Sequence, residues 1–235
     1  MTLRSTFATL LFCGATLVAP AASPTVSIFN GQDLSGWSGD PTRWTVKDGV
    51  ITGQSTEENP IEVNTFLVWQ APVRNFELRA QFRLQGEKAN SGIQYRSHYV
   101  DKATWSVGGY QADMDVINRY TGMLYEERGR GIVVRPGERI RIGPLLESSK
   151  PQLTPVGTPT DPDTLKDAIK TGDWNEIVIV AEGNHLRHYV NGVLTAEAFD
   201  NDPAHAASEG LLALQLHRGP PMIAQFKNLT LTTLP

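Results

Sequence analysis

The clearest pattern in the chain is an alternation of apolar and polar residues within Gly108–Asp115. Its apolar positions are Tyr110, Ala112 and Met114, and its polar positions are Gln111, Asp113 and Asp115. A repeat of two residues predicts a β-strand with one buried face and one polar face. Two carboxylates at alternate positions lie about 7 Å apart. Charges that close raise each other's pKa unless a cation lies nearby.

The segments before and after this strand supply the positive charge. Arg96 lies in Asn90–His98, and Arg128 and Arg130 lie in Tyr120–Gly131. A guanidinium near a carboxylate favours its charged form, so the three segments complement one another if they are adjacent. We therefore expect three neighbouring strands whose shared polar face lines a cleft.

Similar patterns predict strands along the rest of the chain. Phe76–Leu84 alternates almost perfectly, and Gly210–His217 alternates leucines with polar residues near its end. Lys47-Asp48-Gly49 and Asn191-Gly192 lie between apolar runs, where Asp-Gly and Asn-Gly are strong hairpin signals. About a dozen short strands, with turn signals every 8–12 residues, predict an all-β protein: a jelly roll or β-sandwich of two antiparallel sheets.

A proline-rich stretch, Pro144–Thr171, interrupts the strand pattern. Its last part, Asp161–Ile169, predicts a short helix with Pro162 at its start and Gly172 after its end. A long insertion in a strand-rich domain is often a lid over a binding site. A passive cover for a sheet edge is the equal alternative.

The N-terminus has the features of a secretory signal. Arg4 is followed by the apolar run Phe7–Val18 and by small residues at Ala19-Pro20-Ala21. We therefore expect a signal peptide at residues 1–21 and a single exported domain at residues 22–235. The apolar run is too short to span a bilayer, which takes about 20 residues.

Composition excludes several classes of partner. Cys13, the only cysteine, lies in the predicted signal, so the mature chain would carry no thiol and no disulfide. Without Arg4, 20 basic residues face 25 acidic ones, and no basic tract is present. Nucleic acid and anionic membranes are therefore not expected partners. No later segment is apolar enough to span a membrane.

Several catalytic motifs are missing, which leaves acid, arginine and amide chemistry. The sequence has no phosphate loop, dinucleotide fingerprint, zinc helix or nucleophile elbow, and its five histidines lack metal-ligand spacing. The candidates on the first strand face are Gln94, Arg96 and His98, and those on the second are Gln111, Asp113 and Asp115.

The third strand has two mixed faces, so the pattern alone does not settle which one meets the cleft. We favour the face of Met123, Tyr125 and Glu127 over that of Leu124, Glu126 and Arg128. His217 could approach from the strand before the Arg218–Pro221 turn. The alternative for all these residues is a surface ladder of salt bridges, which would contribute little to stability.

Six segments resemble the 3-keto-glycoside lyase/hydratase family, and the resemblance covers about Ser27 to Leu234. They are Phe29–Trp37, Trp44–Ile51, Asn90–Arg96, Gly109–Asp113, Tyr120–Glu126 and Gly210–His217. The resemblance implies a concanavalin-like jelly roll. It also implies a small-molecule sugar substrate and export to the periplasm or medium of a bacterium that degrades glycosides.

The chemistry that the resemblance implies is an elimination. A ketone at C3 acidifies the C2 proton, a base removes it, and the glycosidic oxygen leaves C1; water can then add to the 2-hydroxy-3-keto-glucal. On this basis we expect Asp113 or Glu127 as the base, Arg96 at the enediolate and His217 as the acid. The residues expected to hold the sugar are Gln111, Asp115 and Tyr125, together with Gln94, Glu126 and Arg128.

Three alternatives remain open at this level. Asp113, Asp115 or Glu126 could hold a divalent cation such as Ca²⁺ or Mg²⁺, because clustered carboxylates suit hard cations, although the sequence does not require one. Asp113 with Glu126 or Glu127 could form the carboxylate pair of a hydrolase of unmodified glycosides. A non-catalytic sugar-binding module is the third alternative, since jelly rolls also host lectins.

Overall fold

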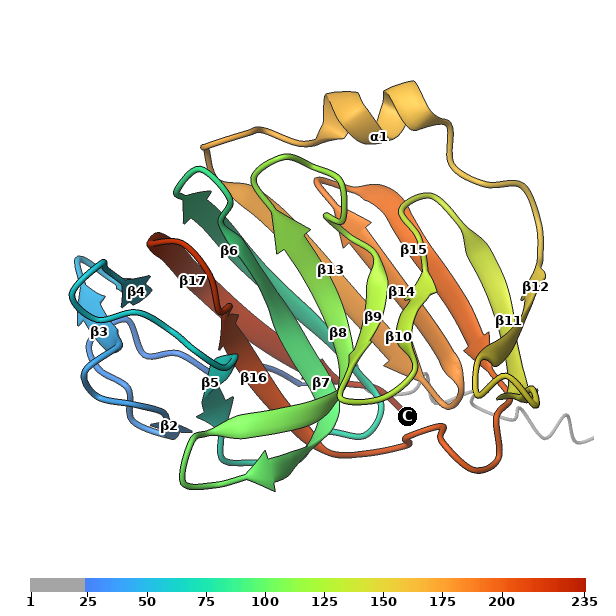
Figure 1. Ribbon diagram of the computed structural model, residues 1–235, viewed down its shortest axis with the longest axis horizontal. Helices are drawn as coiled ribbons and strands as arrows, with labels where there is room; N and C mark the ends of the chain where they lie inside the picture. Colours follow the sequence, from blue (N-terminus) through green and yellow to red (C-terminus); the bar gives the residue numbers. More distant parts are fainter. Residues whose placement is uncertain (1–23) are drawn as a thin grey trace, which may run out of the picture.

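The computed structural model describes residues 24–235, so the predicted signal at residues 1–21, with Cys13, lies outside the described residues. Two β-sheets pack face to face, as Figure 1 shows. The ten-stranded sheet has the order β12 (Pro151–Pro155), β11 (Arg139–Leu145), β15 (Val193–Asp200), β14 (His185–Val190), β13 (Asn175–Glu182), β6 (Phe76–Gln85), β17 (Met222–Thr233), β4 (Val50–Ser55) and β3 (Trp44–Lys47), with β1 (Thr25–Ser27) also paired to β17. The seven-stranded sheet has the order β10 (Gly131–Val134), β9 (Leu124–Glu127), β8 (Ser106–Asp115), β7 (Asn90–Asp101), β16 (Leu211–Leu216), β5 (Thr65–Trp69) and β2 (Trp37–Ser38).

The inner faces of the two sheets form the hydrophobic core. Alternate residues of β6 are buried in it: Phe76, Leu78, Ala80, Phe82 and Leu84. From the opposite sheet, Tyr95 of β7 and Tyr110 of β8 are fully buried, with ring centroids 5.5 Å apart. Removing such large side chains from water is the main gain in folding. The all-β jelly-roll sandwich predicted from the alternation is confirmed, and among the described strands only β11 and β15 pair in parallel.

The two predicted hairpins form as expected. Asp48 and Gly49 join β3 to β4 with φ angles of 50° and 73°. Asn191 and Gly192 join β14 to β15 with φ angles of 47° and 82°. Two successive residues with positive φ define the turn whose twist matches that of a β-hairpin, which is why Asn, Asp and Gly occur there.

The proline-rich insertion covers a sheet edge. Its strand β12 pairs with β11 at the end of the ten-stranded sheet, and its helix α1 (Pro162–Ala168) lies across one end of the sandwich (Figure 1). The side chain of Asp161 caps this helix by accepting from the backbone N–H of Thr164. The predicted helix is confirmed. No described residue of 144–171 lines the cleft around Asp113. The insertion therefore covers a sheet edge and is not a lid over that cleft.

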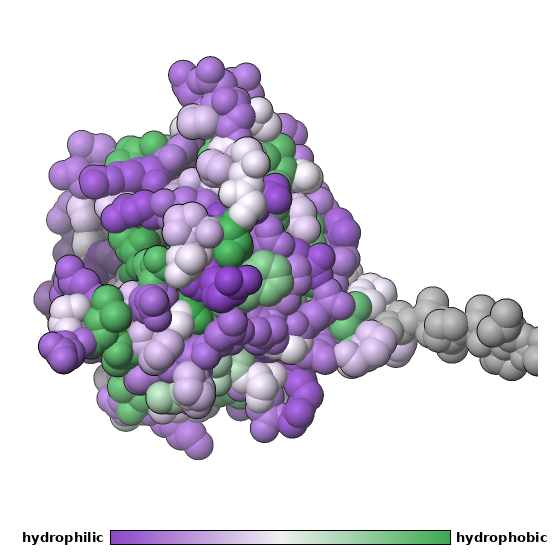
Figure 2. Space-filling model, turned by 90° about the vertical axis from the view of Figure 1, so that its right-hand side faces the viewer, coloured by the Kyte–Doolittle hydropathy of each residue, from purple (hydrophilic) through white to green (hydrophobic). Residues whose placement is uncertain are grey.

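The side of the molecule that carries this edge has a mixed surface, with hydrophilic residues around smaller apolar areas (Figure 2). Between residues 24 and 235, no helix is long and apolar enough to cross a membrane.

Candidate active site

A cleft with a volume of about 700 Å³ lies on the outer face of the seven-stranded sheet. Its floor comes from four adjacent strands and their turns: Asn90 of β7, Gln111 and Asp113 of β8, Tyr125 and Glu127 of β9, and Gln215, His217 and Arg218 at the end of β16. Asn64 and Val63 reach it from the loop before β5. The predicted cleft on a shared polar strand face therefore exists.

Antiparallel register brings these side chains to one face. Gln111 pairs with Tyr125, and Gly109 pairs with Glu127, so β8 and β9 present alternate residues to the cleft. The residues between them turn inward, where Ala112 and Leu124 are buried in the core. Of the two faces considered for the third strand, the one with Tyr125 and Glu127 meets the cleft, as favoured.

Asp113 lies at the centre of the cleft floor and is only 4% exposed. Its Oδ1 accepts from Asn90 Nδ2 at 2.8 Å, and its Oδ2 accepts from Gln111 Nε2 at 2.9 Å. Burial raises the pKa of Asp113 to about 8, although both hydrogen bonds act in the opposite direction. This carboxyl therefore carries a proton at neutral pH and loses it just above.

Glu127 is a second buried carboxyl, at the other side of the cleft. Its Oε2 accepts from Asn64 Nδ2 at 3.2 Å and from Gln215 Nε2 at 3.5 Å. Burial raises the pKa of Glu127, while hydrogen bonding to Asn64 and the charges of Arg128 and Arg218 lower it. Two acidic groups in one cleft thus have different environments, a common feature of acid–base sites.

His217 lines the same cleft as Asp113 and Glu127, and one of its ring nitrogens is already in a hydrogen bond. Its Nδ1 is in hydrogen-bond contact with the backbone carbonyl of Arg218, which can only accept, so Nδ1 carries the proton. Burial lowers the pKa of His217 below its ordinary value; the hydrogen bond to the Arg218 carbonyl raises it, and the charge of Arg218 lowers it. The ring is therefore neutral at pH 7, and no described residue hydrogen-bonds its Nε2. It is suited to accept a proton.

Two arginines at the rim supply positive charge. Arg128 Nε lies 3.8 Å from Glu127 Oε1, and half of the Arg128 side chain is exposed. Arg218 is exposed, and its guanidinium makes no hydrogen bond or ion pair with a described residue. Both charges lower the pKa of Tyr125 and Glu127, which lie between them, although burial raises the pKa of each group overall.

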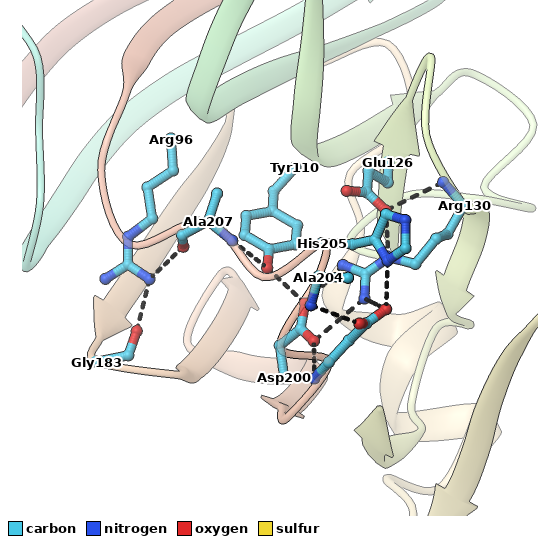
Figure 3. Close-up of polar contacts among 10 residues, drawn as sticks. Arg96, Tyr110, Glu126, Arg130, Gly183, Asp200, Ala204, His205 and Ala207 are labelled. Atoms are coloured by element: carbon cyan, nitrogen blue, oxygen red, sulfur yellow. Dashed lines mark hydrogen bonds and ion pairs between the residues drawn. The ribbon is translucent and has the colours of Figure 1, made fainter. Parts of the chain in front are cut away.

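Arg96 is not in the cleft, contrary to expectation. A β-bulge follows Tyr95, and Arg96 has a φ of 48°, so the alternation of β7 breaks at this residue. Its guanidinium turns to the opposite face and donates to the carbonyls of Arg74, Gly183 and Ala207. Figure 3 shows the last two of these contacts. Arg96 therefore joins loops and cannot stabilise an enediolate in the cleft. His98 also lies beyond the bulge and does not line the cleft.

Glu126 also faces away from the cleft. Its Oε2 accepts from Arg130 Nε at 2.5 Å, and Arg130 in turn binds Asp200 and Asp202, as Figure 3 shows for the Glu126 and Asp200 contacts. Burial alone would lower the pKa of Arg130, but its hydrogen bonds to Asp200 and Glu126 raise that pKa well above its ordinary value. The expected sugar contact of Glu126 is therefore wrong: this is a structural ion cluster beneath the turn that carries Glu127.

Asp115 and Gln94 have structural partners as well. The Asp115 carboxylate accepts from the backbone N–H groups of Arg119, Tyr120 and Thr121, which fixes the loop after β8. Gln94 is completely buried under Gln111 and does not line the cleft. Neither residue is placed to touch a sugar.

The divalent cation that the sequence left open does not fit these positions. Asp115 uses both carboxylate oxygens on backbone N–H groups, and Glu126 lies on the other face, so neither can join Asp113. Within residues 24–235, no group of three or more His, Cys, Asp or Glu side chains is arranged to hold a metal ion. We derive no step through a metal.

Pattern reasoning missed several polar residues of the cleft, among them Gln215 at the end of β16. Asn64 comes from an irregular loop far from the strands in sequence, and no local signal marks it. Asn90 begins β7 and binds Asp113 across the strand pair, while Arg218 follows His217 in a turn. The last two could have been found, since each is a polar residue next to a predicted site strand.

The fold and cleft define a jelly-roll protein with buried carboxyl groups, a partly buried imidazole and guanidinium groups at the rim, all on one sheet face. The chain belongs to the family described as the 3-keto-alpha-glucoside-1,2-lyase-like domain, whose model matches residues 24–232. This is a carbohydrate-active family. A search of curated proteins finds no match.

Solved structures share the fold at low sequence identity. A putative glycosyl hydrolase from Parabacteroides distasonis has a TM-score of 0.59 and 16% identity, covering 90% of this chain and all of that one. A second from the same organism has a TM-score of 0.57 and 18% identity, with 90% and 94% coverage. The carbohydrate-binding module CBM66 from Bacillus subtilis has a TM-score of 0.53 and 17% identity, with 84% and 96% coverage. Likeness at this level establishes the fold alone.

Proposed function

We propose that this protein cleaves 3-keto-glycosides by removing the C2 proton and eliminating the substituent at C1. The observation that carries the proposal is one cleft that holds a carboxyl with a pKa of about 8, Asp113, and a neutral imidazole with a free Nε2, His217. A protonated acid and an unprotonated base are the two groups that an elimination needs at neutral pH. The family to which the chain belongs supports the same substrate class.

His217 is the base in this proposal. The backbone carbonyl of Arg218 fixes its tautomer, so Nε2 keeps its lone pair for the C2 proton. The C3 ketone makes that proton acidic because the electrons left behind spread onto the ketone oxygen. The sequence-based assignment of His217 as acid is replaced, since a neutral ring with Nδ1–H already donated has no proton to give from Nε2.

Asp113 is the acid. At pH 7 its carboxyl is protonated, so it can give that proton to the glycosidic oxygen as the C1–O bond breaks. The glycosidic oxygen takes this proton as the C1–O bond breaks and the C1–C2 double bond forms, and the aglycone departs as an alcohol. The amide donors of Asn90 and Gln111 then stabilise the new carboxylate.

The enediolate, for which the sequence suggested Arg96, is stabilised in this proposal by Arg128, Arg218 and Tyr125. Negative charge grows on the C3 oxygen during proton removal, and fixed positive groups or hydroxyl donors lower the energy of that state. Two guanidiniums at the cleft rim and the Tyr125 hydroxyl are available for it. Burial raises the pKa of Tyr125, which keeps that hydroxyl protonated. Glu127 and Gln215 remain to accept from and donate to sugar hydroxyls.

Addition of water to the elimination product would return His217 and Asp113 to their starting protonation states. After elimination His217 is protonated and Asp113 is ionised. Water can then add across C1=C2: Asp113 takes a proton from the water that attacks C1, and His217 returns its proton to C2. Each residue ends in its starting state, so elimination followed by hydration gives net hydrolysis without an external proton carrier.

The two alternatives have weaker support. A sugar-binding module commonly stacks its ligand on exposed aromatics, but none of the five tryptophans lines the cleft within the described chain. The Parabacteroides structures carry glycosyl hydrolase descriptions, which fit a hydrolase of unmodified glycosides equally well. Asp113 and Glu127 would then form the carboxylate pair.

The deciding experiment uses a 3-keto-glucoside and its unoxidised twin, each with the same chromogenic aglycone. The proposal expects aglycone release and enone absorbance from the oxidised compound, and no turnover of the twin. Cleavage of both substrates at similar rates would support the hydrolase, and binding without cleavage of either would support the module.

A further inference from the structure

A row of buried polar side chains ends on Asp113. Ser97 Oγ lies 2.7 Å from Gln94, Gln94 lies 2.8 Å from Gln111, and Gln111 lies 2.9 Å from Asp113 Oδ2. All four residues are at most 4% exposed. Because bulk water does not reach this row, each contact must join a donor to an acceptor within the protein.

In one arrangement every donor points toward Asp113. Ser97 Oγ donates to Gln94 Oε1, Gln94 Nε2 donates to Gln111 Oε1, and Gln111 Nε2 donates to Asp113 Oδ2. This arrangement suits an ionised carboxylate, which only accepts. At the other end of the row this arrangement is unfavourable. Gln94 Oε1 lies 3.3 Å from the backbone carbonyl oxygen of Gly109 and 3.2 Å from that of Tyr110, and none of these oxygens can donate a hydrogen bond.

The reverse arrangement removes that conflict. Rotation of the Gln94 amide exchanges its oxygen and nitrogen, so the nitrogen donates to the carbonyls of Gly109 and Tyr110 and to Ser97 Oγ. The Gln94 oxygen then faces Gln111, which must rotate as well to present its nitrogen. The Gln111 oxygen now faces Asp113 Oδ2, and that contact is a hydrogen bond only if Asp113 carries a proton. The weaker contact of Gln111 Nε2 with Gln215 Oε1, at 3.4 Å, exists only in the first arrangement.

We propose that the amide pair Gln94–Gln111 reverses its direction each time Asp113 gains or loses its proton. The pair donates to the carboxylate and accepts from the carboxylic acid, so both states of Asp113 are hydrogen-bonded without any movement of the backbone. Gln94 and Gln111 are then positioning residues for the acid in the elimination. That catalytic meaning rests on the proposed function, but the reversal itself does not.

The site is shaped for the Gln111 amide. Gly92 pairs with Asp113 across β7 and β8, and a Cβ at Gly92 would lie 2.6 Å from Gln111 Cδ and 2.7 Å from its Nε2. Real Cβ atoms do not approach this closely, so glycine leaves the room in which the amide sits. The ionisable groups around Asp113 are Asp115 on the same strand, Tyr125, Glu127 and Arg128 on or after β9, and His217 and Arg218 after β16.

The test is an NMR titration of the purified protein without substrate, following the Asp113 carboxyl carbon and the side-chain amides of Gln94 and Gln111. We expect both amides to shift with the midpoint of Asp113. In Gln94→Met the carbonyls of Gly109 and Tyr110 no longer hold the pair in the reversed arrangement. Gln111 then donates to Asp113 at every pH, and the acid dissociation constant of Asp113 rises about tenfold.

Gln225→Met on β17 is the matched control, because it makes the same replacement away from the cleft and leaves the Asp113 midpoint unchanged. With a 3-keto-glucoside, Gln94→Met should move the alkaline limb of kcat/KM to lower pH by the same amount, which a purely structural role would not do. The proposal is overturned if the side-chain amide shifts of Gln94 and Gln111 do not change as Asp113 titrates in the native protein. This measurement does not depend on the folding of any variant. Coupled titration without turnover of any 3-keto-glycoside would reject the proposed function and leave this inference standing.

Discussion

At the scale of single residues, Asp113 and His217 divide the work of acid and base through their surroundings. One carboxyl is buried among amides and keeps its proton, while one imidazole donates its only N–H in a hydrogen bond to a backbone carbonyl. Since burial disfavours the charged form of either group, both are neutral at pH 7. Neutral groups in a closed cleft can pass protons to and from a sugar without first losing the hydration of a charge.

This division predicts a bell-shaped pH dependence of kcat/KM on a 3-keto-glucoside. The rate should fall below the lowered pKa of His217, where the ring is protonated, and above about pH 8, where Asp113 has lost its proton. Initial rates between pH 4 and 10 measure both limbs. A rate that instead rises through pH 8 would mean that Asp113 is the base.

The His217→Gln variant should lose at least about a hundredfold in kcat, and its pH profile should also lose the acid limb.

A second prediction concerns the effect of Asp113 on the free energy of unfolding, which depends on pH. Its pKa is higher in the folded chain than in the unfolded one, so its contribution is favourable below about pH 4 and is lost as pH rises through about 8. Asp113→Asn removes this loss. We expect the variant to be more stable than the native protein above pH 8 by about 1–3 kcal/mol, and to lose its elimination activity. Thermal melts at pH 5 and pH 9 check the first part: an equal difference at both values would contradict it.

At the scale of elements, the turn between β9 and β10 carries two arginines with opposite tasks. Arg128 extends over the cleft beside Glu127, whereas Arg130 is buried on the other face with Glu126, Asp200 and Asp202. The sequence identified both as cations near the carboxylates but could not separate them. The reason is that strand alternation ends at Glu127: Arg128 has a φ of 58° and starts a turn. Arg96 was misplaced for a related reason, since nothing local marks its bulge.

The two arginines predict opposite phenotypes. Arg130→Met leaves three buried carboxylates without their guanidinium and should cost about 3–5 kcal/mol of unfolding free energy. Arg128→Ala removes a half-exposed pair and should change stability by less than about 1 kcal/mol, while it lowers kcat/KM because a rim cation is gone. Urea unfolding and kinetics on both variants test this. A destabilised Arg128→Ala, or an unaffected Arg130→Met, would contradict the assignment of the two faces.

At the scale of the whole molecule, the alternation of apolar and polar residues was enough to predict the sandwich and, for β8, the polar face that meets the cleft. Period-two burial along β6 and the two tight hairpins required only local information. The same information could not place Asn64, which reaches Glu127 from 63 residues away. It also could not show whether the proline-rich insertion covers the cleft or an edge, because that depends on which strand β12 joins.

The edge strand β12 yields a final prediction about association. Pro151 and Pro155 begin and end it, so neither residue can offer an N–H to another chain, while Leu153 between them is 41% exposed. Proline at a sheet edge is a common protection against edge-to-edge pairing. Changing both prolines to valine should give an apolar strand that pairs with itself, and light scattering at increasing concentration should show larger particles than for the native protein. Because β12 belongs to the other sheet and none of its residues lines the cleft, kcat/KM per folded chain should stay unchanged. A double variant that stays dispersed would show that the prolines serve the turn geometry and not the edge.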